Sequence, residues 1–437
     1  MKKFLALFLA AVLCLSLAAC GAKDNNAQTN NDDQQNNQQQ GSDTPSTGDE
    51  NVTTGNAVKV GFIFLHDENS TYDLNFINAA KLACEKLGVD YMTKTNIPEG
   101  QECYEAAMDL VDNGCNVVFA DSFGHEDYMI QAAKKCPDVQ FCHATGTRAH
   151  TEGLDNFHNA FASIYEGRYL AGVAAGEKIN EMIAQGKITA DKAKMGYVGA
   201  YTYAEVISGY TSFYLGAKSV CPSVTMDVTF TGSWYDETAE KEAAQKLIQN
   251  GAVLVSQHAD SMGAPTACES AGVPNVSYNG STESACPNTF IVSSRINWAP
   301  YLEHCIEAVR DGKTIEPDWT GTLSDNSVLL TDFGQKATAE GTADAVEKAK
   351  KAIEDGSVHV FDVNTFTVTV TEDKNKNAKV DADGHLTSYM ADVDTDAAYT
   401  PDKEVVSDGY FHESEYRAAP YFDVQIDGIN LLDVNFG

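Results

Sequence analysis

The sequence predicts an α/β protein made of two lobes, each a doubly wound parallel sheet, with a cleft between them. From Ala57 onward, apolar β-branched runs of strand length alternate with longer stretches of helical periodicity. The alternation starts again near Met195, which indicates a second unit of the same kind. Strands that are separated by helices pair in parallel and are covered by helices on both faces.

Each expected strand is a short apolar run bounded by turn residues. The strands are Val58–Leu65, Val89–Thr95, Asn116–Asp121, Val139–Thr145, Met195–Ala200, Thr225–Thr231, Val253–His258, Asn275–Tyr278 and Thr289–Ser294. The helices include Asn75–Leu87, Cys103–Asn113, Ile164–Ile183, Glu205–Ser219, Thr238–Gln249 and Tyr301–Arg310. Several of these helices are followed by a glycine, as is typical of helix C-termini, namely Gly88, Gly114, Gly251 and Gly312.

The two lobes are expected to be discontinuous in the sequence. Residues 58–160 and about 285–320 form the first lobe, and about 161–284 and 321–437 form the second. Residues 358–437 are rich in Asp, Thr and Val and predict short strands and turns rather than further strand–helix units. The second lobe therefore carries an extended C-terminal segment.

The N-terminus has the pattern of a lipoprotein signal peptide over residues 1–19. Its apolar stretch, Phe4–Leu17, is too short to span a bilayer. The stretch ends in LAAC, which resembles the bacterial lipobox, whose cysteine (here Cys20) is acylated and becomes the mature N-terminus. The alternative is a plain signal peptide with an incidental cysteine. Residues 20–57 are a polar low-complexity stretch, which predicts a disordered linker behind the lipidated cysteine.

The charge and the cysteines exclude several classes of protein. A formal net charge of −33 repels nucleic acid and anionic lipid headgroups, so no nucleic-acid partner is expected. Besides Cys14 and Cys20, nine of the 11 cysteines remain. Their odd number and the lack of any CxxC favour buried thiols over a disulfide framework or a zinc site.

No enzyme motif is present, and no cofactor is expected. The sequence lacks GxSxG, GxxxxGK[ST], HExxH and GxGxxG, so neither a nucleotide site nor a metalloprotease site is predicted. Asp373, Asn375, Asn377 and Asp381 are spaced like the start of a calcium loop. However, Ala378 and Gly384 stand where such a loop needs glycine and glutamate. A polar turn between strands is the preferred interpretation, with calcium binding as the alternative.

Polar and aromatic residues recur where the expected strands end. In open α/β sheets, ligands bind beyond the carboxyl ends of the strands, and pocket residues come from several such loops. Aromatic rings beside amides and carboxylates suit a planar ligand with hydrogen-bonding edges. Any one of these residues is more often a loop anchor or a core residue, so the prediction rests on their recurrence. The candidate ligand-binding residues are Asp67, Asn69, Tyr72, Asn75, Ser122, Phe123, His143, Tyr203, Glu205, Trp234, His258, Asp260, Asn279 and Trp298.

Four ordered blocks of sequence resemble the basic membrane protein family. They are NAFASIYEGRYLAGVAAG (159–176), GYVGAYTYAEVISGYTSFYLGAKSVCP (196–222), GSWYDETAEKEAAQKLIQNGAVLVSQHADS (232–261) and SYNGS (277–281). The resemblance implies a lipoprotein of the type I periplasmic-binding-protein fold that serves an ABC importer. It further implies a purine base or purine nucleoside as ligand, and a permease and an ATPase as partners.

The resemblance also bears on single residues. Phe123, Glu205, Trp234 and Asp260 stand at positions like those of the family, and Tyr72 is the nearest candidate for the aromatic that stacks on the base. Asn279 stands where an aspartate is common, which weakens a contact to ribose hydroxyls, and residues 365–415 depart from the family.

The expected function is therefore that of a monomeric, extracytoplasmic receptor, anchored to the membrane by lipid, that closes on a purine-like ligand. Three alternatives stay open. In the first alternative, the ligand is a sugar or another small polar solute. In the second, the protein is a ligand-sensing domain that acts on a signalling receptor. In the third, it is an extracellular hydrolase such as a nucleosidase that uses Asp67 or Asp260.

Overall fold

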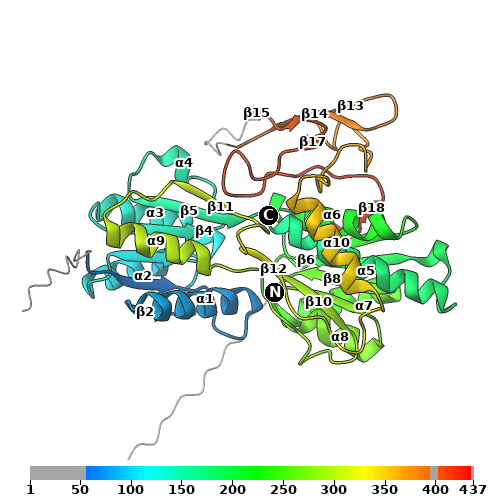
Figure 1. The fold of residues 1–437 in the computed structure, drawn as a ribbon, viewed down its shortest axis with the longest axis horizontal. Coiled ribbons are helices and arrows are strands. Elements are labelled where there is room, and N and C mark those ends of the chain that lie inside the picture. The colour runs from blue at the N-terminus through cyan, green and yellow to red at the C-terminus, as the bar shows by residue number, and fades with distance from the viewer. Residues whose placement is uncertain (1–55, 394–401, 435–437) are drawn as a thin grey trace, which may run out of the picture. The chain divides into compact units, whose positions relative to one another are not determined.

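The computed structural model describes residues 56–393 and 402–434 (Figure 1). The expected signal peptide, Cys20 and nearly all of the expected linker lie outside these residues. Every expected strand and helix is present, with its ends shifted by a few residues at most. Helices and strands alternate as expected, and two large sheets each have their own set of helices.

The first sheet has six strands, all of them parallel. In spatial order they are β11 (Asp318–Gly321), β5 (Phe157–Ala162), β4 (Gln140–Ala144), β3 (Val117–Ala120), β1 (Lys59–Ile63) and β2 (Asp90–Lys94). Its helices are α1 (Thr71–Leu87), α2 (Gln101–Asp112), α3 (Glu126–Lys135), α4 (Ala149–Glu152) and α9 (Ala299–Asp311). We call this sheet and its helices the first lobe.

The second sheet has seven strands, of which only β12 runs antiparallel to its neighbour. In spatial order they are β12 (Val328–Leu330), β10 (Phe290–Ile296), β9 (Asn275–Tyr278), β8 (Leu254–His258), β6 (Lys194–Gly199), β7 (Thr225–Phe230) and β18 (Ile429–Leu431). Its helices are α5 (Ile164–Ala184), α6 (Ala204–Val220), α7 (Glu237–Gln249), α8 (Gly263–Ala271) and α10 (Thr342–Glu354). We call this sheet and its helices the second lobe.

The chain passes between the lobes after β5, after β10 and after β11. The expected boundary near residue 285 precedes β10, but β10 pairs with β9 in the second sheet. The passage back to the first lobe lies instead between β10 and α9, because α9 packs beside α1 on the first sheet. The division of the chain into folding domains stays a prediction.

Strand alternation gives each sheet two apolar faces. On β1, Val60 and Phe62 face the layer formed by α1 and α9, whereas Ile63 faces α2 and α3. On β6, Tyr197 packs with α5 and α6, whereas Val198 packs against α7 and α8. Successive strand residues point to opposite faces, so a helical layer on each side is needed to bury both.

Helix α1 begins earlier than the sequence predicts, and this difference matters for the site. Ser70 caps the helix, since its side chain accepts a hydrogen bond from the backbone N–H of Asp73. Tyr72 and Asp73 therefore lie in the first helical turn, which follows directly on the loop after β1. At the other end, Gly88 adopts the left-handed conformation with φ 64° and ends the helix as predicted.

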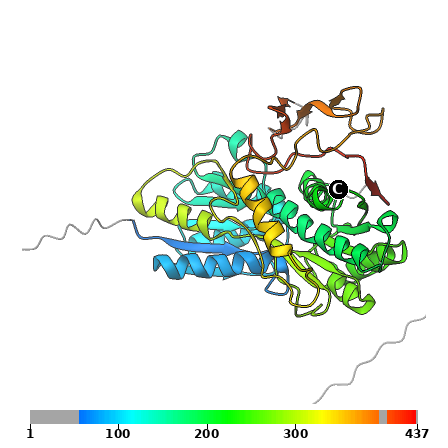
Figure 2. The same cartoon turned by 45° about the vertical axis from the view of Figure 1, so that its right-hand side comes forward.

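The C-terminal segment forms short strands outside the two large sheets (Figure 2). They are β13 (Ala378–Val380), β14 (Leu386–Ala391), β15 (Lys403–Glu404), β16 (Val406–Ser407) and β17 (Tyr410–Phe411). The segment then returns to the second sheet through β18, beside β7. Short strands and turns were predicted for this region, and the structure confirms them.

The calcium-like sequence lies in a turn of this segment. Asn375 has φ +55°, and its side chain bonds the backbone of Thr369 and Gln425 instead of facing a common centre with the acidic residues. Within the described ranges, no group of three or more His, Cys, Asp or Glu side chains is arranged to hold a metal ion. The polar turn is the interpretation that these contacts support.

The cysteines and the helices bear on two further predictions. The nine cysteines in residues 56–393 are free thiols, and all but Cys136 are fully buried, as expected of small apolar side chains.

Among the residues that the structure describes, no helix is long and apolar enough to cross a membrane.

Helices α5 and α6 pack closely because glycines line their contact. A Cβ atom added at Gly172 would lie 2.1 Å from the backbone oxygen of Phe213. One added at Gly216 would lie 2.0 Å from the backbone oxygen of Tyr169. A backbone atom cannot move aside as a side chain can, so only glycine allows this approach.

We expect Gly172→Ala to destabilise the protein by about 1–3 kcal/mol through overpacking, although alanine favours helices over glycine by about 1 kcal/mol. Urea unfolding followed by circular dichroism measures the difference. Gly280→Ala is the control, because its new Cβ would make an ordinary contact at 3.5 Å with the Thr71 side chain. A Gly172→Ala protein as stable as the wild type would contradict the packing argument.

Candidate functional site

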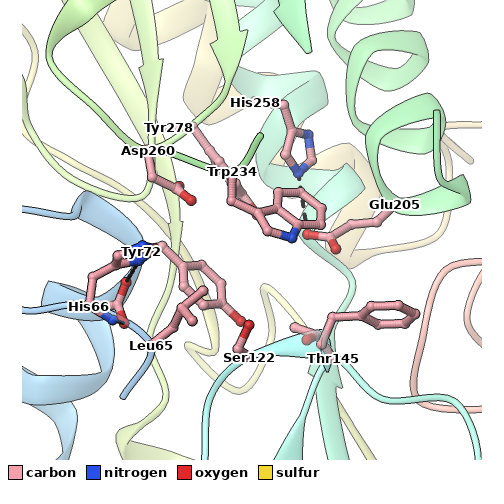
Figure 3. A pocket seen from close by; sticks show the side chains of 12 residues that line it. Leu65, His66, Tyr72, Ser122, Thr145, Glu205, Trp234, His258, Asp260 and Tyr278 are labelled. Atoms are coloured by element: carbon pink, nitrogen blue, oxygen red, sulfur yellow. Dashed lines mark hydrogen bonds and ion pairs between the residues drawn. The ribbon is translucent and has the colours of Figure 1, made fainter. Parts of the chain in front are cut away.

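A cavity with an empty volume of about 400 Å³ lies where the carboxyl ends of the two sheets meet (Figure 3). The first lobe contributes the loops after β1, β3 and β4 and the first turn of α1. The second lobe contributes the start of α6, the loop after β7 and the ends of β8 and β9. The lining residues are Leu65, His66, Tyr72, Asp73, Ser122, Phe123, Thr145, Glu205, Trp234, His258, Asp260 and Tyr278.

Half of the predicted ligand-binding residues line this cavity. They are Tyr72, Ser122, Phe123, Glu205, Trp234, His258 and Asp260. The others lie elsewhere, and each has a partner that explains its position. The cavity also contains residues that sequence reasoning did not select, namely Leu65, His66, Asp73, Thr145 and Tyr278.

Two of the predicted residues are core residues behind the site. Trp298 is 1% exposed and stacks on Phe76 of α1, with ring centroids 4.4 Å apart. His143 is fully buried in β4, where its Nε2 lies 2.7 Å from the backbone oxygen of Ser122. Burial lowers the pKa of His143 to about 4, so the ring is neutral at physiological pH. His143 supports the loop that carries Ser122 and Phe123 without lining the cavity.

Asp67 and Asn69 bond each other at the exposed surface, through the Asn69 amide and the Asp67 carboxylate at 2.8 Å. Asn75 and Asn279 line a separate hollow, where the Asn75 amide donates to Asn279 at 3.4 Å. Tyr203 lines a chamber that adjoins the cavity. None of these residues lines the cavity itself.

On the first lobe, a buried carboxylate organises the loop after β1. The backbone N–H of His66 and the hydroxyl of Ser70 donate to the two Asp73 oxygens, at 2.7 and 2.6 Å. Burial opposes ionisation of Asp73, but the His66 side chain, with Nδ1 3.4 Å from Oδ2, and these two hydrogen bonds outweigh it, and the pKa of Asp73 is lowered. The neighbouring Asp121 behaves in the opposite way, because burial and then the Asp73 charge hold its pKa well above the usual range.

Tyr72 lies between this loop and the cavity. Its hydroxyl donates to the backbone oxygen of Asp121 at 2.6 Å, and its ring meets Phe76 edge-on with centroids 5.0 Å apart. The ring is thus held at both ends, with the remaining face toward the cavity (Figure 3).

On the second lobe, Asp260 directs its carboxylate into the cavity (Figure 3). The Asn279 amide donates to one of its oxygens at 3.1 Å. Burial, followed by the charges of Glu240 and Asp73, raises the pKa of Asp260 well above the usual range. Its two oxygens offer hydrogen-bonding partners to a molecule in the cavity.

Buried aromatic and basic side chains position the carboxylate of Glu205. Its Oε1 lies 3.2 Å from Nε2 of His258, whose pKa burial lowers to about 4. The His258 ring packs on Tyr278 at 4.6 Å, and the Arg168 guanidinium carbon lies 3.5 Å above the Tyr278 ring centroid. The Tyr278 hydroxyl has no hydrogen-bond partner among the described residues, which leaves it available to a ligand.

Aromatic rings from both lobes meet at the edge of the cavity. Phe123 of the first lobe lies 5.6 Å from Tyr203 of the second, and Tyr203 lies 6.0 Å from Trp234. Phe123 is 39% exposed, which is unusual for so large an apolar ring. Flat rings close to carboxyl and hydroxyl groups can stack on a planar molecule and hydrogen-bond its edge.

Residues 65–358 match the model of the Bmp family, described as ABC transporter substrate-binding protein PnrA-like. A purine-binding protein of Brucella abortus is 33% identical over 260 residues, covering 58% of this chain and 69% of that protein. A putative ABC transporter glucose-binding protein of Haloferax volcanii is 28% identical over 251 residues, covering 57% of this chain and 60% of that protein.

The fold agrees with this relationship. The crystal structure of an ABC transporter solute-binding protein from Aeropyrum pernix superposes with a TM-score of 0.59 at 18% identity, covering 72% of this chain and 95% of that one. The two largely parallel sheets with helices on both faces have the fold of periplasmic-binding proteins, as the sequence predicts. The chain belongs to the Bmp family of PnrA-like ABC transporter substrate-binding proteins, which bind solutes and are not enzymes.

Proposed function

We propose that the protein binds a purine base or purine nucleoside in this cavity and presents it to an ABC importer. Membership of the family implies a small-molecule ligand, an extracytoplasmic location, and a permease and an ATPase as partners. The proposal adds the nature of the ligand. The observation that carries it is the convergence of Trp234, Tyr72 and Phe123 with Glu205 and Asp260 in one cavity.

This set of groups matches the chemistry of a purine. Stacking of an aromatic side chain on a base contributes about 1–3 kcal/mol. A purine edge presents both donors and acceptors, and the Asp260 carboxyl, the Glu205 carboxylate and the Tyr278 hydroxyl supply both kinds of partner. The name of the Brucella relative, a purine-binding protein, supports the same ligand class.

A sugar is the second candidate, because the Haloferax relative is named a putative glucose-binding protein. A hexose would need several side chains that bond its ring of hydroxyls. Three of the rings near this cavity, Phe123, Tyr203 and Trp234, form a continuous aromatic group instead. The purine is favoured on that ground.

The anchoring of the protein forms a further part of the proposal. Acylation of Cys20 would hold the monomer at the outer side of the cell membrane, with residues 20–57 as the tether.

We expect Cys20→Ala to move the protein from the membrane fraction to the soluble extracytoplasmic fraction, because the acyl chains are lost. Immunoblots of fractionated cells measure the distribution, and Cys14→Ala is the matched control within the signal. Retention of Cys20→Ala in the membrane would refute the lipid anchor.

Protein that is purified from its host and then denatured should release a purine, identified by mass spectrometry. Ligand-free protein should show a raised melting temperature with purine bases or nucleosides and none with hexoses, since a ligand that binds only the folded state stabilises it. A response to glucose alone would establish the sugar alternative and reject the purine.

Trp234→Ala should weaken purine binding by about 5- to 150-fold, the equivalent of one stacking contact of about 1–3 kcal/mol. Isothermal titration calorimetry measures the affinity. Trp319→Ala is the control, because Trp319 packs on Tyr301, away from the cavity, and its loss should leave affinity unchanged. Equal affinities for wild type and Trp234→Ala would remove Trp234 from the site.

A further inference from the structure

A second chamber, with an empty volume of about 510 Å³, adjoins the cavity. The two share Phe123, Thr145, Glu205 and Trp234 as lining residues. The C-terminal segment completes the second chamber with Arg417, Ala419 and Pro420. These three residues lie beyond the part of the chain that matches the Bmp family, which ends at residue 358.

The wall that the C-terminal segment provides is fixed to both lobes. In the second lobe, the Ser208 hydroxyl of α6 donates to the buried Glu413 carboxylate at 2.7 Å. In the first lobe, the Asn159 amide of β5 donates to the backbone oxygen of Ala418 at 2.8 Å. Ala419, the next residue, is 2% exposed, so this stretch of the wall is firmly packed. Figures 1 and 2 both draw the segment beside α6.

The side chain of Asn159 also holds the loop after β4. The backbone N–H of Gly146 donates to Oδ1 of Asn159, and Nδ2 of Asn159 donates to the backbone oxygen of Gly146, both at 2.8 Å. Gly146 lies between Thr145 and Thr147, which line the chamber. One buried amide thus joins the C-terminal segment to a loop of the first lobe, and this contact gives the wall of the chamber a defined position.

The charge of Arg417 is already balanced within the protein. Its two terminal nitrogens donate to the backbone oxygens of Asp392 and Pro420, at 3.2 and 3.0 Å. Burial lowers the pKa of Arg417, and the negative charges of Asp392, Glu126 and Asp318 act against that effect. The chamber is therefore better suited to a neutral polar group than to an anion.

The polar atoms of the chamber match hydroxyl groups. Nε of Arg417 has no hydrogen-bond partner among the described residues, so its N–H can donate to an oxygen in the chamber. The carboxylate of Glu205 can accept from an O–H and would repel an anion. A hydroxyl group both donates and accepts, so a sugar can bond both partners.

The order of the two spaces fits the shape of a purine nucleoside. His258, Asp260 and Tyr278 line the first cavity alone, whereas Ala419 and Pro420 line the second chamber alone. In a purine nucleoside, the sugar is attached to the five-membered ring, away from the hydrogen-bonding edge of the six-membered ring. A base whose edge meets Asp260 and Tyr278 therefore directs its sugar toward the second chamber.

We infer that the C-terminal segment is a wall of the ligand site, and that Ala419 and Pro420 determine its specificity by leaving room for the sugar of a purine nucleoside. This inference rests on the proposed purine function and narrows the ligand from a purine base or nucleoside to the nucleoside. In this arrangement the base lies against Trp234 and Tyr72, and the sugar lies between Glu205 and the C-terminal segment.

The test is calorimetric titration of the full-length mature protein with adenine, adenosine, hypoxanthine and inosine. Each nucleoside that binds should bind at least about threefold more tightly than its base, as expected of a further hydrogen bond. Ala419→Leu, which extends a larger side chain into the chamber, should weaken nucleoside binding by about tenfold to a hundredfold and base binding by less than about twofold. Ser219→Leu is the control, because it adds a leucine to a different hollow beside the same segment and should change neither affinity.

The outcomes separate this inference from the proposed function. If wild type binds a base as tightly as its nucleoside or more tightly, the sugar chamber is rejected and the purine site stands. If no base and no nucleoside binds, the purine function fails, and the inference fails with it. This comparison needs no variant.

The variant gives a second, independent decision. An Ala419→Leu protein that loses affinity for base and nucleoside equally, or for neither, would overturn the inference. Should Ala419→Leu not fold, Ala419→Val adds less volume at the same place and should lower nucleoside affinity selectively, by a smaller factor.

Discussion

Two hydrogen bonds from Thr71 to the backbone oxygen of Asp260 join the lobes across the cavity, one from the backbone N–H and one from the hydroxyl, each at 3.2 Å. Thr71 opens α1, so the next residues in the helix, Tyr72 and Asp73, reach the cavity from the first lobe. Asp260 lies in the loop after β8, and this loop faces Tyr72 and Asp73 from the second lobe. These two hydrogen bonds share one backbone acceptor and help to set the distance between the two halves of the site, together with the packing of Phe123 on Tyr203 and of His66 on Tyr235.

Several acidic side chains lie in and behind the cavity, and burial and neighbouring groups shift their pKa values in different directions. Asp73 keeps a lowered pKa because His66 and Ser70 donate to it. Asp121 and Asp260 have pKa values raised far above the usual range by burial and by neighbouring carboxylates. Each ionised carboxylate disfavours ionisation of a buried carboxyl close to it. Neighbouring carboxyl groups of the site therefore have pKa values shifted in opposite directions by the same burial and by different partners.

The fold was readable from the sequence because periodicity and glycine positions report local structure directly. The site was readable only in part. Strand ends could be found, but a strand-end loop offers several polar residues, and the side chain that faces the cavity depends on the direction of the backbone there. At β4 the cavity residue is Thr145, which follows the strand with φ +67°, whereas His143 within the strand is fully buried. At the end of β9, the residue that lines the cavity is Tyr278 and not the adjacent Asn279.

Other differences came from contacts between distant parts of the chain. Trp298 looked like a loop aromatic, but it follows a passage between lobes and packs on Phe76, which no local pattern reveals. Arg417 lies more than two hundred residues after Glu205 in the sequence, and only the fold brings the two to one chamber. The early start of α1 was legible in principle, since Ser70 and Asp73 have the spacing of a helix cap.

The contact between the lobes also limits how strongly a ligand can drive closure. A ligand shifts the equilibrium toward the closed form only by the difference between its affinities for the two forms. The Thr71 hydrogen bonds, at about 1 kcal/mol each, and the packing of His66 on Tyr235 favour closure even without ligand. Their sum is small beside the stacking and the edge hydrogen bonds of the proposed purine ligand. Closure should therefore depend mainly on the ligand, as a receptor requires if its permease is to distinguish loaded from empty protein.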